Sequence, residues 1–431
     1  MAALSNLSYL HVPPGRPYNY NTVTQIAREN ARLRPNQELL IIRELDGSRY
    51  TLTNASLYQQ AEHLARYLVT LGVKRGDIVG LVGPNSLEKA IGSLGIMLAG
   101  AIIWNANINL KTAQDVMAQI QLLQARVMLV DCGKDNCFLP PVKAMLDHYT
   151  VQTDSANEDT DIKVTYLRKT DDNMSETLER IQSLQLDQIE LPIIYPEDDA
   201  IVLPTSGSTG KSKIVRHSHF SLYKLPSSQY SVCGDVGRPF PGVEIRIVDH
   251  QDIPIEKGMI GKIQVRSPYA MKKYDRNPEL TKRAFTEEKW YRTGDLGNLS
   301  RDGNLVIVGR EADVISRGCK TIYPGVLESL LKGMTSIKDV CVVPVPDKRL
   351  LEEVCACFVS SGQVNPEDVK KFFEQKLFKE QTQNNLSEIP TYFLQFEAFP
   401  EVGNGKFDRK TIRRDAIARL GLTKAHASMN K

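Results

Sequence analysis

Residues 205–213 have the sequence Thr-Ser-Gly-Ser-Thr-Gly-Lys-Ser-Lys and follow the apolar stretch 200–203. A short apolar run that ends at turn-forming residues predicts a buried strand. Hydroxyls and glycines at this density cannot build a core. A loop of them can surround a polyphosphate with backbone N–H groups and hydroxyls, and the lysines add positive charge. The segment therefore predicts a nucleoside-triphosphate site at the end of a strand.

One candidate for this segment is the P-loop of nucleoside triphosphatases. That signature requires a glycine, four residues and then Gly-Lys-Ser/Thr. The sequence ends correctly in Gly210-Lys211-Ser212, but Thr205 stands where the first glycine is needed. The run Val-Met-Leu-Val-Asp that ends at Asp131 is similar to a Walker B strand, although it precedes the loop. The P-loop NTPase is therefore an alternative that matches only in part.

Five motifs in a fixed order give a second interpretation. They are TSGSTGKSK at 205–213, GRPFPG at 237–242, YRTGD at 291–295, GREAD at 309–313 and GNGKFDRK at 403–410. In this order they resemble the adenylate-forming (AMP-binding) superfamily of acyl-CoA synthetases, luciferases and peptide-synthetase adenylation domains. Residues 8–86 are most similar to the animal medium-chain fatty acyl-CoA ligases. The resemblance implies that ATP and a carboxylate give an acyl-adenylate, from which the acyl group passes to coenzyme A.

The resemblance also implies a role for each matched residue. Lys406 would be catalytic, because its charge would lie between the carboxylate and the α-phosphate as two anions approach. Asp295 would accept both ribose hydroxyls, and Arg310 would bind the nucleotide and move with the C-terminal domain. The loop would bind the β- and γ-phosphates through Thr205, Ser206, Gly207, Ser208, Thr209, Gly210 and Lys213. ATP, Mg²⁺ and coenzyme A are the implied cofactors and co-substrates, and no side chain of this sequence is assigned to a metal.

The sequence is short between the phosphate loop and the Gly-Arg-Pro turn. Only residues 211–233 lie there, where the resemblance implies roughly a hundred further residues, close to a domain's worth of chain. That block would carry a Tyr-Gly-x-Thr-Glu motif with a Mg²⁺-binding glutamate, the backbone beside adenine and much of the acyl pocket. We therefore expect an impaired medium-chain acid–CoA ligase. The alternatives are an inactive pseudoenzyme or interaction isoform, a luciferase-like oxidase and the P-loop NTPase.

Composition limits the partners and the compartment. The 431 residues are 42% hydrophobic and 24% charged, and the net charge of +3 is too small to indicate nucleic acid or an anionic membrane as partner. The longest apolar run, near 90–104, is too short to span a membrane. Seven cysteines without zinc-type spacing favour a reducing compartment. We expect small-molecule partners and a cytoplasmic location. A mitochondrial location is the alternative, although no clear presequence is recognisable. No peroxisomal C-terminal signal is recognisable either.

The predicted fold class is α/β. A helix is predicted at 56–71, with Asn54 or Ser56 as its cap and Gly72 at its end. Strands are predicted at 78–82, 101–104 and 127–130, and this order of helical and strand segments predicts a parallel sheet. Residues 1–308 are predicted to form a large AMP-binding domain, incomplete between 211 and 233, that becomes β-rich after Gly242. Residues 309–431 are predicted to form a smaller, mobile α/β domain. His219 matches a family position that caps the following helix, so we expect a structural role for it.

Overall fold

The computed structural model describes residues 6–14, 20–43, 47–106, 119–132, 162–168, 177–205, 213–222, 236–362, 364–380, 389–402 and 406–422. Its internal contacts divide the chain into two compact units. Residues 16–226 and 268–282 form the first, which we call the parallel-sheet unit. Residues 1–15, 227–267 and 283–431 form the second, which we call the C-terminal unit. The domain boundary predicted between 308 and 309 falls inside the C-terminal unit and stays a prediction.

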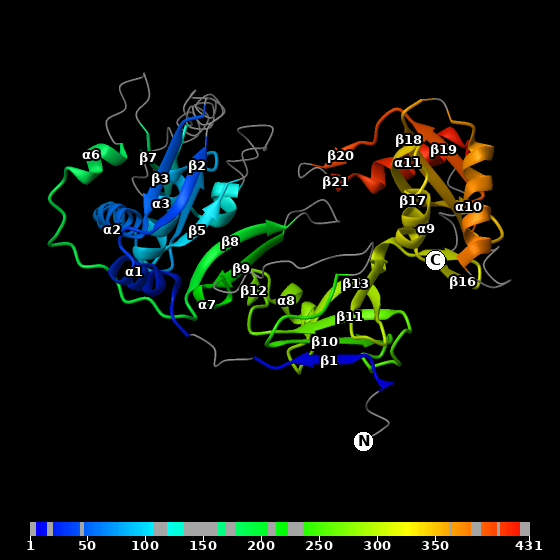
Figure 1. Ribbon diagram of the computed structural model, residues 1–431, viewed down its shortest axis with the longest axis horizontal. Helices are drawn as coiled ribbons and strands as arrows, with labels where there is room; N and C mark the ends of the chain where they lie inside the picture. The colour runs from blue at the N-terminus through cyan, green and yellow to red at the C-terminus, as the bar shows by residue number, and fades with distance from the viewer. Residues whose placement is uncertain are drawn as a thin grey trace. The chain divides into compact units, whose positions relative to one another are not determined.

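The parallel-sheet unit is built on a seven-stranded sheet with the order β12-β9-β8-β5-β4-β6-β7 (Figure 1). Its strands are β4 (Ile78–Val82), β5 (Ile102–Asn105), β6 (Val127–Val130), β7 (Lys163–Tyr166), β8 (Asp199–Thr205), β9 (Lys213–Ser218) and β12 (Lys273–Tyr274). The five strands from β8 to β7 are parallel, whereas β9 and β12 are antiparallel to their neighbours. Every residue of β4 and β6 is buried, because continuous apolar runs suit a sheet covered on both faces. The predicted parallel sheet is confirmed.

Three helices and a hairpin pack on this sheet. They are α1 (Val23–Leu33), α2 (Asn54–Thr70), α3 (Leu87–Leu98) and the pair β2 (Glu38–Arg43) and β3 (Arg49–Thr53). The prediction that Asn54 or Ser56 caps α2 is wrong: Thr53 is the N-cap, and its hydroxyl accepts the Ser56 N–H at 3.2 Å. The prediction that the helix ends at Gly72 is confirmed, and this glycine has a φ of +90°. Two short helices, α6 (Leu178–Gln182) and α7 (His219–Leu222), complete the described part of the unit.

The C-terminal unit contains an antiparallel sheet with the order β1-β10-β11-β13-β14. Its strands are β1 (Tyr9–Val12), β10 (Val243–Val248), β11 (Gly261–Arg266), β13 (Tyr291–Leu299) and β14 (Leu305–Arg310). Helix α8 (Pro278–Ala284) precedes β13, and the division of the sequence into the two units falls within this helix, after Lys282. This sheet is the β-rich part that was expected after Gly242. Its edge strand β1 comes from the N-terminus and pairs with β10, which the sequence reasoning missed.

A second sheet of the C-terminal unit has the order β16-β15-β18-β17, with β19 beside β18. Its strands are β15 (Ile315–Arg317), β16 (Lys320–Ile322), β17 (Ile337–Asp347), β18 (Leu351–Ser360) and β19 (Tyr392–Phe396). Helices α9 (Pro324–Leu331), α10 (Pro366–Glu380) and α11 (Arg409–Arg419), the turn η3 (Glu311–Asp313) and the hairpin β20 (Glu401–Val402) and β21 (Lys406–Phe407) accompany it. Two apolar clusters form the core of this part. The mixture of sheets and helices confirms the predicted α/β class. No helix in the described ranges is long and apolar enough to cross a membrane.

Candidate functional site

Asp295, the predicted ribose ligand, lies on β13 and is held there by the two residues before it. Gly294 has a φ of +77°, a conformation that costs a glycine little. The Thr293 hydroxyl donates a hydrogen bond to the Ile263 carbonyl on β11 at 2.9 Å and accepts the Asp295 N–H at 3.0 Å. The Thr-Gly-Asp order therefore fixes the backbone that carries the carboxylate.

Arg310 lies directly opposite Asp295 in the antiparallel pair of β13 and β14. Its Nε is 2.7 Å from Asp295 Oδ1. The guanidinium is exposed and the carboxylate is partly buried. Two residues that were predicted to bind the same nucleotide are therefore neighbours in the structure.

Lys406, the predicted catalytic residue, begins the short strand β21, opposite Val402 on β20. The next residue, Phe407, packs edge-on against Phe399 with the ring centroids 5.0 Å apart. Asp408 then caps α11 and accepts the Thr411 N–H at 3.2 Å. The lysine side chain is exposed, so an anchored backbone presents a mobile ammonium group to solvent.

Electrostatics join these three predicted residues. Burial raises the pKa of the Asp295 carboxyl above its ordinary value, and the positive charges of Arg310 and Lys406 act in the opposite direction. Lys406 is therefore close enough to influence Asp295, although more than a hundred residues separate them in the sequence. An acceptor carboxylate beside two cations suits a ligand that has both hydroxyls and phosphates.

Arg409 is a further residue of this region, to which the sequence reasoning gave no role. Its Nη2 is 2.6 and 2.8 Å from the two carboxylate oxygens of Glu328 on α9, and its Nη1 donates to the Val342 carbonyl at 3.1 Å. Its Nε is 3.8 Å from Asp313 in η3. The arginine therefore joins the segment after Lys406 to the turn after Arg310. Its place inside the 403–410 motif was the available signal.

The predicted phosphate loop belongs to the parallel-sheet unit. Thr205 ends β8 and lies opposite Lys213, which begins β9. Ser206, Gly207, Ser208, Thr209 and Gly210 lie outside the described residues. The Lys213 ammonium lies over the Tyr274 ring, 5.6 Å from its centroid, in range of a cation–π contact. The phosphate-binding roles of these residues stay predictions.

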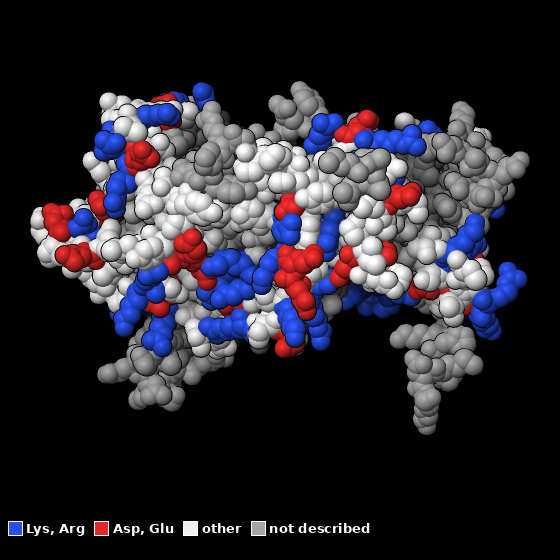
Figure 2. Space-filling model, turned by 90° about the horizontal axis from the view of Figure 1, so that it is seen from below, with Lys and Arg blue, Asp and Glu red and all other residues white. Residues whose placement is uncertain are grey.

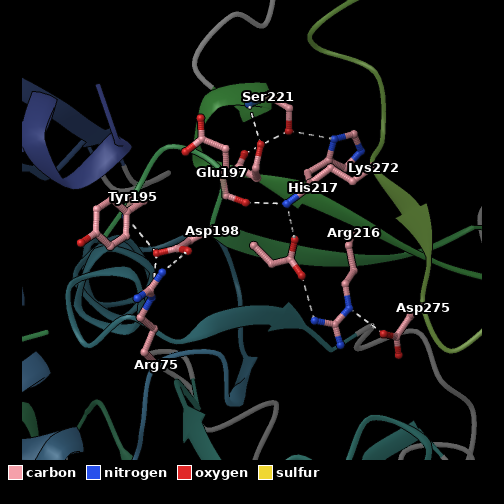
Figure 3. Close-up of polar contacts among 11 residues, drawn as sticks. Arg75, Tyr195, Glu197, Asp198, Arg216, His217, Ser221, Lys272 and Asp275 are labelled. Carbon is pink, nitrogen blue, oxygen red and sulfur yellow. Dashed lines mark hydrogen bonds and ion pairs between the residues drawn. The ribbon is translucent and has the colours of Figure 1, made fainter. Parts of the chain in front are cut away.

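A charge network fastens β9 to a segment that follows much later in the chain (Figure 3). Arg216 Nε is 2.6 Å from the Asp275 carboxylate, and its Nη1 is 3.0 Å from Asp199 on β8. Lys272 donates to the Glu197 carbonyl and lies 3.4 Å from Asp199. Alternating charges on β8, β9 and 272–275 hold the short strand β12 at the sheet edge. They therefore support the strand that leads out of the predicted phosphate loop.

Two histidines follow the loop, and both are better suited to structure than to proton transfer. Burial lowers the pKa of His217, whose Nδ1 is 3.3 Å from the Ser221 hydroxyl. Burial also lowers the pKa of His219 to about 4, although the nearby Asp198 acts in the opposite direction. The expectation that His219 caps the helix is wrong, because the Ser218 hydroxyl accepts the Ser221 N–H at 3.3 Å. His219 is instead a buried, neutral residue of α7.

The charged side chains of the described residues are mixed in sign on one face of the molecule. Basic and acidic side chains lie among one another on the face shown in Figure 2, which agrees with the small net charge. Among the described residues, no group of three or more His, Cys, Asp or Glu side chains could hold a metal ion.

Residues 27–233 match the AMP-binding enzyme family. The chain carries an AMP-binding enzyme domain. Its relatives include pyochelin synthase PchD of Pseudomonas aeruginosa, 35% identical over 178 residues, or 41% of this chain and 32% of PchD. The medium-chain acyl-CoA ligase ACSF2 of Rattus norvegicus is 32% identical over 192 residues, which are 44% of this chain and 30% of that protein. The predicted resemblance to the AMP-binding superfamily is therefore confirmed, and the chain has acyl-CoA ligases among its relatives.

The match extends further in structure than in sequence. The anthranilate CoA ligase AuaEII, solved with anthranoyl-AMP, superposes with a TM-score of 0.75 at 17% identity, over 94% of this chain and 98% of that one. At this identity the likeness shows the fold alone. In sequence, the chain spans about a third of the length of the curated relatives it matches. The AMP-binding domain is therefore established, and the activity of the whole chain is a matter of inference.

Proposed function

We propose that this chain is an ATP-dependent carboxylate–CoA ligase for a medium-chain fatty acid, with an activity reduced by its short linker after residue 211. One observation carries the proposal: Asp295, Arg310 and Lys406 belong to the same unit and interact electrostatically. Arg310 forms an ion pair with the Asp295 carboxylate, and the charges of both Arg310 and Lys406 lower the pKa of that carboxyl. The similarity of residues 27–233 to AMP-binding enzymes supports the reaction type. The chain length of the acid is the finer part of the proposal and rests on the sequence resemblance.

In the first half-reaction, a carboxylate oxygen of the acid attacks the α-phosphorus of ATP and pyrophosphate leaves. The Lys406 ammonium would offset the negative charge that the two reactants bring together. The Asp295 carboxylate would accept hydrogen bonds from the ribose hydroxyls, and the Arg310 guanidinium would donate to the nucleotide. Mg²⁺ would arrive with ATP and screen its phosphates, as this ion commonly keeps water and phosphate oxygens as ligands.

In the second half-reaction, the thiolate of coenzyme A attacks the carbonyl carbon of the acyl-adenylate and AMP leaves. The charge argument for Lys406 applies only to the first half-reaction, since the α-phosphate is a leaving group in the second. Lys406→Ala should therefore abolish adenylate formation and leave thiol transfer from a supplied acyl-adenylate comparatively intact. Equal losses in the two half-reactions, measured separately, would contradict the assignment of Lys406.

The reduced activity follows from what the short linker omits. Losing one strong electrostatic contact at such a site costs about 3 kcal/mol of transition-state stabilisation, or on the order of a hundredfold in rate. We expect weak ATP binding and almost no acyl-CoA in a pyrophosphate-release assay with ATP, Mg²⁺, CoA and acids of increasing chain length. Lys406→Ala is the background control. Turnover of about one per second, which is ordinary for an enzyme, would show that residues 211–233 rebuild the site.

The P-loop NTPase is disfavoured by the surroundings of Asp131. A Walker B aspartate must be available to a metal ion beside the phosphates. Asp131 is fully buried, accepts a hydrogen bond from the Ser86 hydroxyl and lies 2.9 Å from Arg168 Nε. Its carboxylate is thus already neutralised within the sheet. An ATPase activity that survives Lys406→Ala and is lost in Asp131→Asn would reverse this choice.

A further inference from the structure

The Arg409 side chain makes contacts with three elements of the C-terminal unit. It bonds to Glu328 on α9 and to the Val342 carbonyl on β17, and its Nε is 3.8 Å from Asp313 in η3. Lys406 lies three residues before this arginine, at the start of β21. The contacts of Arg409 therefore fix one end of a short segment whose other end carries the predicted catalytic lysine.

Glu328, the acid that Arg409 pairs with, is itself anchored. Its Oε1 accepts the Val342 N–H at 2.8 Å, so both backbone groups of Val342 bond to the ion pair. β17 is an edge strand in the described part of its sheet, and α9 and α11 both pack on it (Figure 1). Because the Glu328 side chain is only 14% exposed and binds the guanidinium through both oxygens, it gives the arginine a defined place and direction.

The backbone that carries Lys406 depends on such an anchor. β20 and β21 are two residues long each and pair with one another, and an isolated two-stranded hairpin is marginally stable in water. Phe407 packs against Phe399, and the Asp408 N–H donates to the Pro400 carbonyl at 2.7 Å. The apolar contact is non-directional. The forked contact of the arginine with a carboxylate adds the orientation that the hairpin lacks.

The turn η3 connects Arg409 to the ion pair across β13 and β14. It begins directly after Arg310. Its first residue, Glu311, is 2.7 Å from the Lys262 ammonium on β11, the strand next to β13. Its last residue, Asp313, faces Arg409. The same turn is thus in contact with the sheet that carries the predicted nucleotide ligands and with the arginine that follows the predicted catalytic lysine.

We propose that Arg409 is a positioning residue for Lys406. Its pair with Glu328 holds the β20–β21 hairpin so that the lysine ammonium stays close to the Asp295 carboxylate. Such placement matters for catalysis, since a misplacement of about 1 Å can cost on the order of a hundredfold in rate. The catalytic meaning rests on the proposed function, in which Lys406 is the cation of adenylate formation. The position of Lys406 itself can be measured without ATP.

The test uses the pKa of Asp295 as a measure of where the Lys406 ammonium lies. Carbon-13 NMR of labelled aspartate in the full chain gives the rise of this pKa on Lys406→Gln, first in the otherwise unchanged protein and then in Arg409→Met. We expect a rise in the unchanged protein, because Lys406 lowers this pKa, and a rise at least halved in Arg409→Met. Each rise is taken within one background, so a direct effect of the Arg409 charge cancels.

The outcomes separate this proposal from the proposed function. An equal rise in the two backgrounds would overturn the positioning role of Arg409 and leave Lys406 beside Asp295. No rise in the unchanged protein would remove Lys406 from the site, and would contradict the proposed function together with the role of Arg409.

Two further variants make the test specific. Arg413→Met is the matched control, because Arg413 lies one turn later on α11 and pairs with Glu352 at 3.3 Å; the full rise on Lys406→Gln should persist there. Glu328→Gln removes the charge that binds Arg409 and keeps an oxygen for the Val342 N–H, so it should fold even if Arg409→Met does not, and it should reduce the rise. A full rise in Glu328→Gln, or an equal reduction in Arg413→Met, would overturn the proposal.

Discussion

Two arginine–aspartate pairs of this protein have the same chemistry and different surroundings. Arg216 and Asp275 are 2.6 Å apart, and their side chains are 15% and 5% exposed. Arg310 and Asp295 are 2.7 Å apart, and their side chains are 60% and 25% exposed. The first pair joins β9 to a segment from later in the chain, and the second lies across β13 and β14. Distance alone therefore does not separate a structural pair from a ligand-binding pair.

Burial separates them. If Asp275 is removed, water cannot readily replace it beside Arg216, so a charge is left poorly compensated inside the protein. If Asp295 is removed, the exposed Arg310 guanidinium returns to water, and exposed pairs contribute little to stability. The same exposure leaves Asp295 and Arg310 able to exchange each other for a ligand. We therefore expect the first pair to control folding and the second to control binding.

The largest expected effect is on stability in the parallel-sheet unit. Asp275→Ala should lower the free energy of unfolding by about 3 to 4 kcal/mol, the range for breaking one side of a buried ion pair, with Asp199 still bound to Arg216. Urea unfolding gives the total, and hydrogen exchange of β9 amides gives the local change. Asp295→Ala is the matched control and should lose less than about 1 kcal/mol. If both variants lose the same free energy of unfolding, burial does not explain the difference between the two ion pairs.

The second largest expected effect concerns His219, a buried base whose stability contribution also depends on burial. Its pKa is lowered to about 4 in the folded state by burial, against about 6.5 unfolded. Between these values the unfolded chain binds the proton and the folded chain does not, so stability is present above pH 6.5 and is lost as the pH falls towards 4. The loss should reach about 2 to 3 kcal/mol.

Equilibrium unfolding from pH 7 to pH 4 measures this loss. His219→Gln should flatten the dependence, because glutamine does not titrate. His250→Gln, a change at an exposed histidine, serves as the control and should retain it. A dependence that is the same in His219→Gln and in the unchanged protein would assign the titration to another group.

In the Arg310–Asp295 pair, the main expected response to a substitution is a change in the pKa of Asp295. Arg310→Ala removes a charge that lowers the pKa of Asp295, so this pKa should rise further above its ordinary value. Because the carboxyl is then protonated to a higher pH when folded than when unfolded, stability falls as the pH rises through that window. Carbon-13 NMR of labelled aspartate follows the titration. Arg310→Lys keeps the charge and should shift the pKa less, and an unchanged or lowered pKa in Arg310→Ala would contradict the ion pair.

The contrast also explains what could be predicted from the sequence. The strands β4 and β6 are continuous apolar runs, as expected for strands that are buried on both faces of a sheet, and the limits of both strands were predicted closely. Asp295, Arg310 and Lys406 were singled out because their motifs resemble a family. Their meeting depends on the β13–β14 register and on the β20–β21 hairpin, which no local pattern encodes. The pairing of β1 with β10 and the Arg216–Asp275 contact were missed for the same physical reason, since each joins segments far apart in the chain.

The smallest expected effect tests whether Lys406 belongs with the exposed pair. Lys406 lowers the pKa of Asp295 less than Arg310 does, as expected for a flexible and exposed ammonium group screened by solvent. Lys406→Gln should therefore raise the pKa of Asp295 in the same direction as Arg310→Ala by a smaller amount, and added salt should reduce the difference. Lys410→Gln, a change on the nearby first turn of α11, is the control for a general loss of positive charge. If Lys406→Gln and Lys410→Gln shift the titration equally, Lys406 has no special place beside Asp295, and the proposed adenylation site loses its catalytic cation.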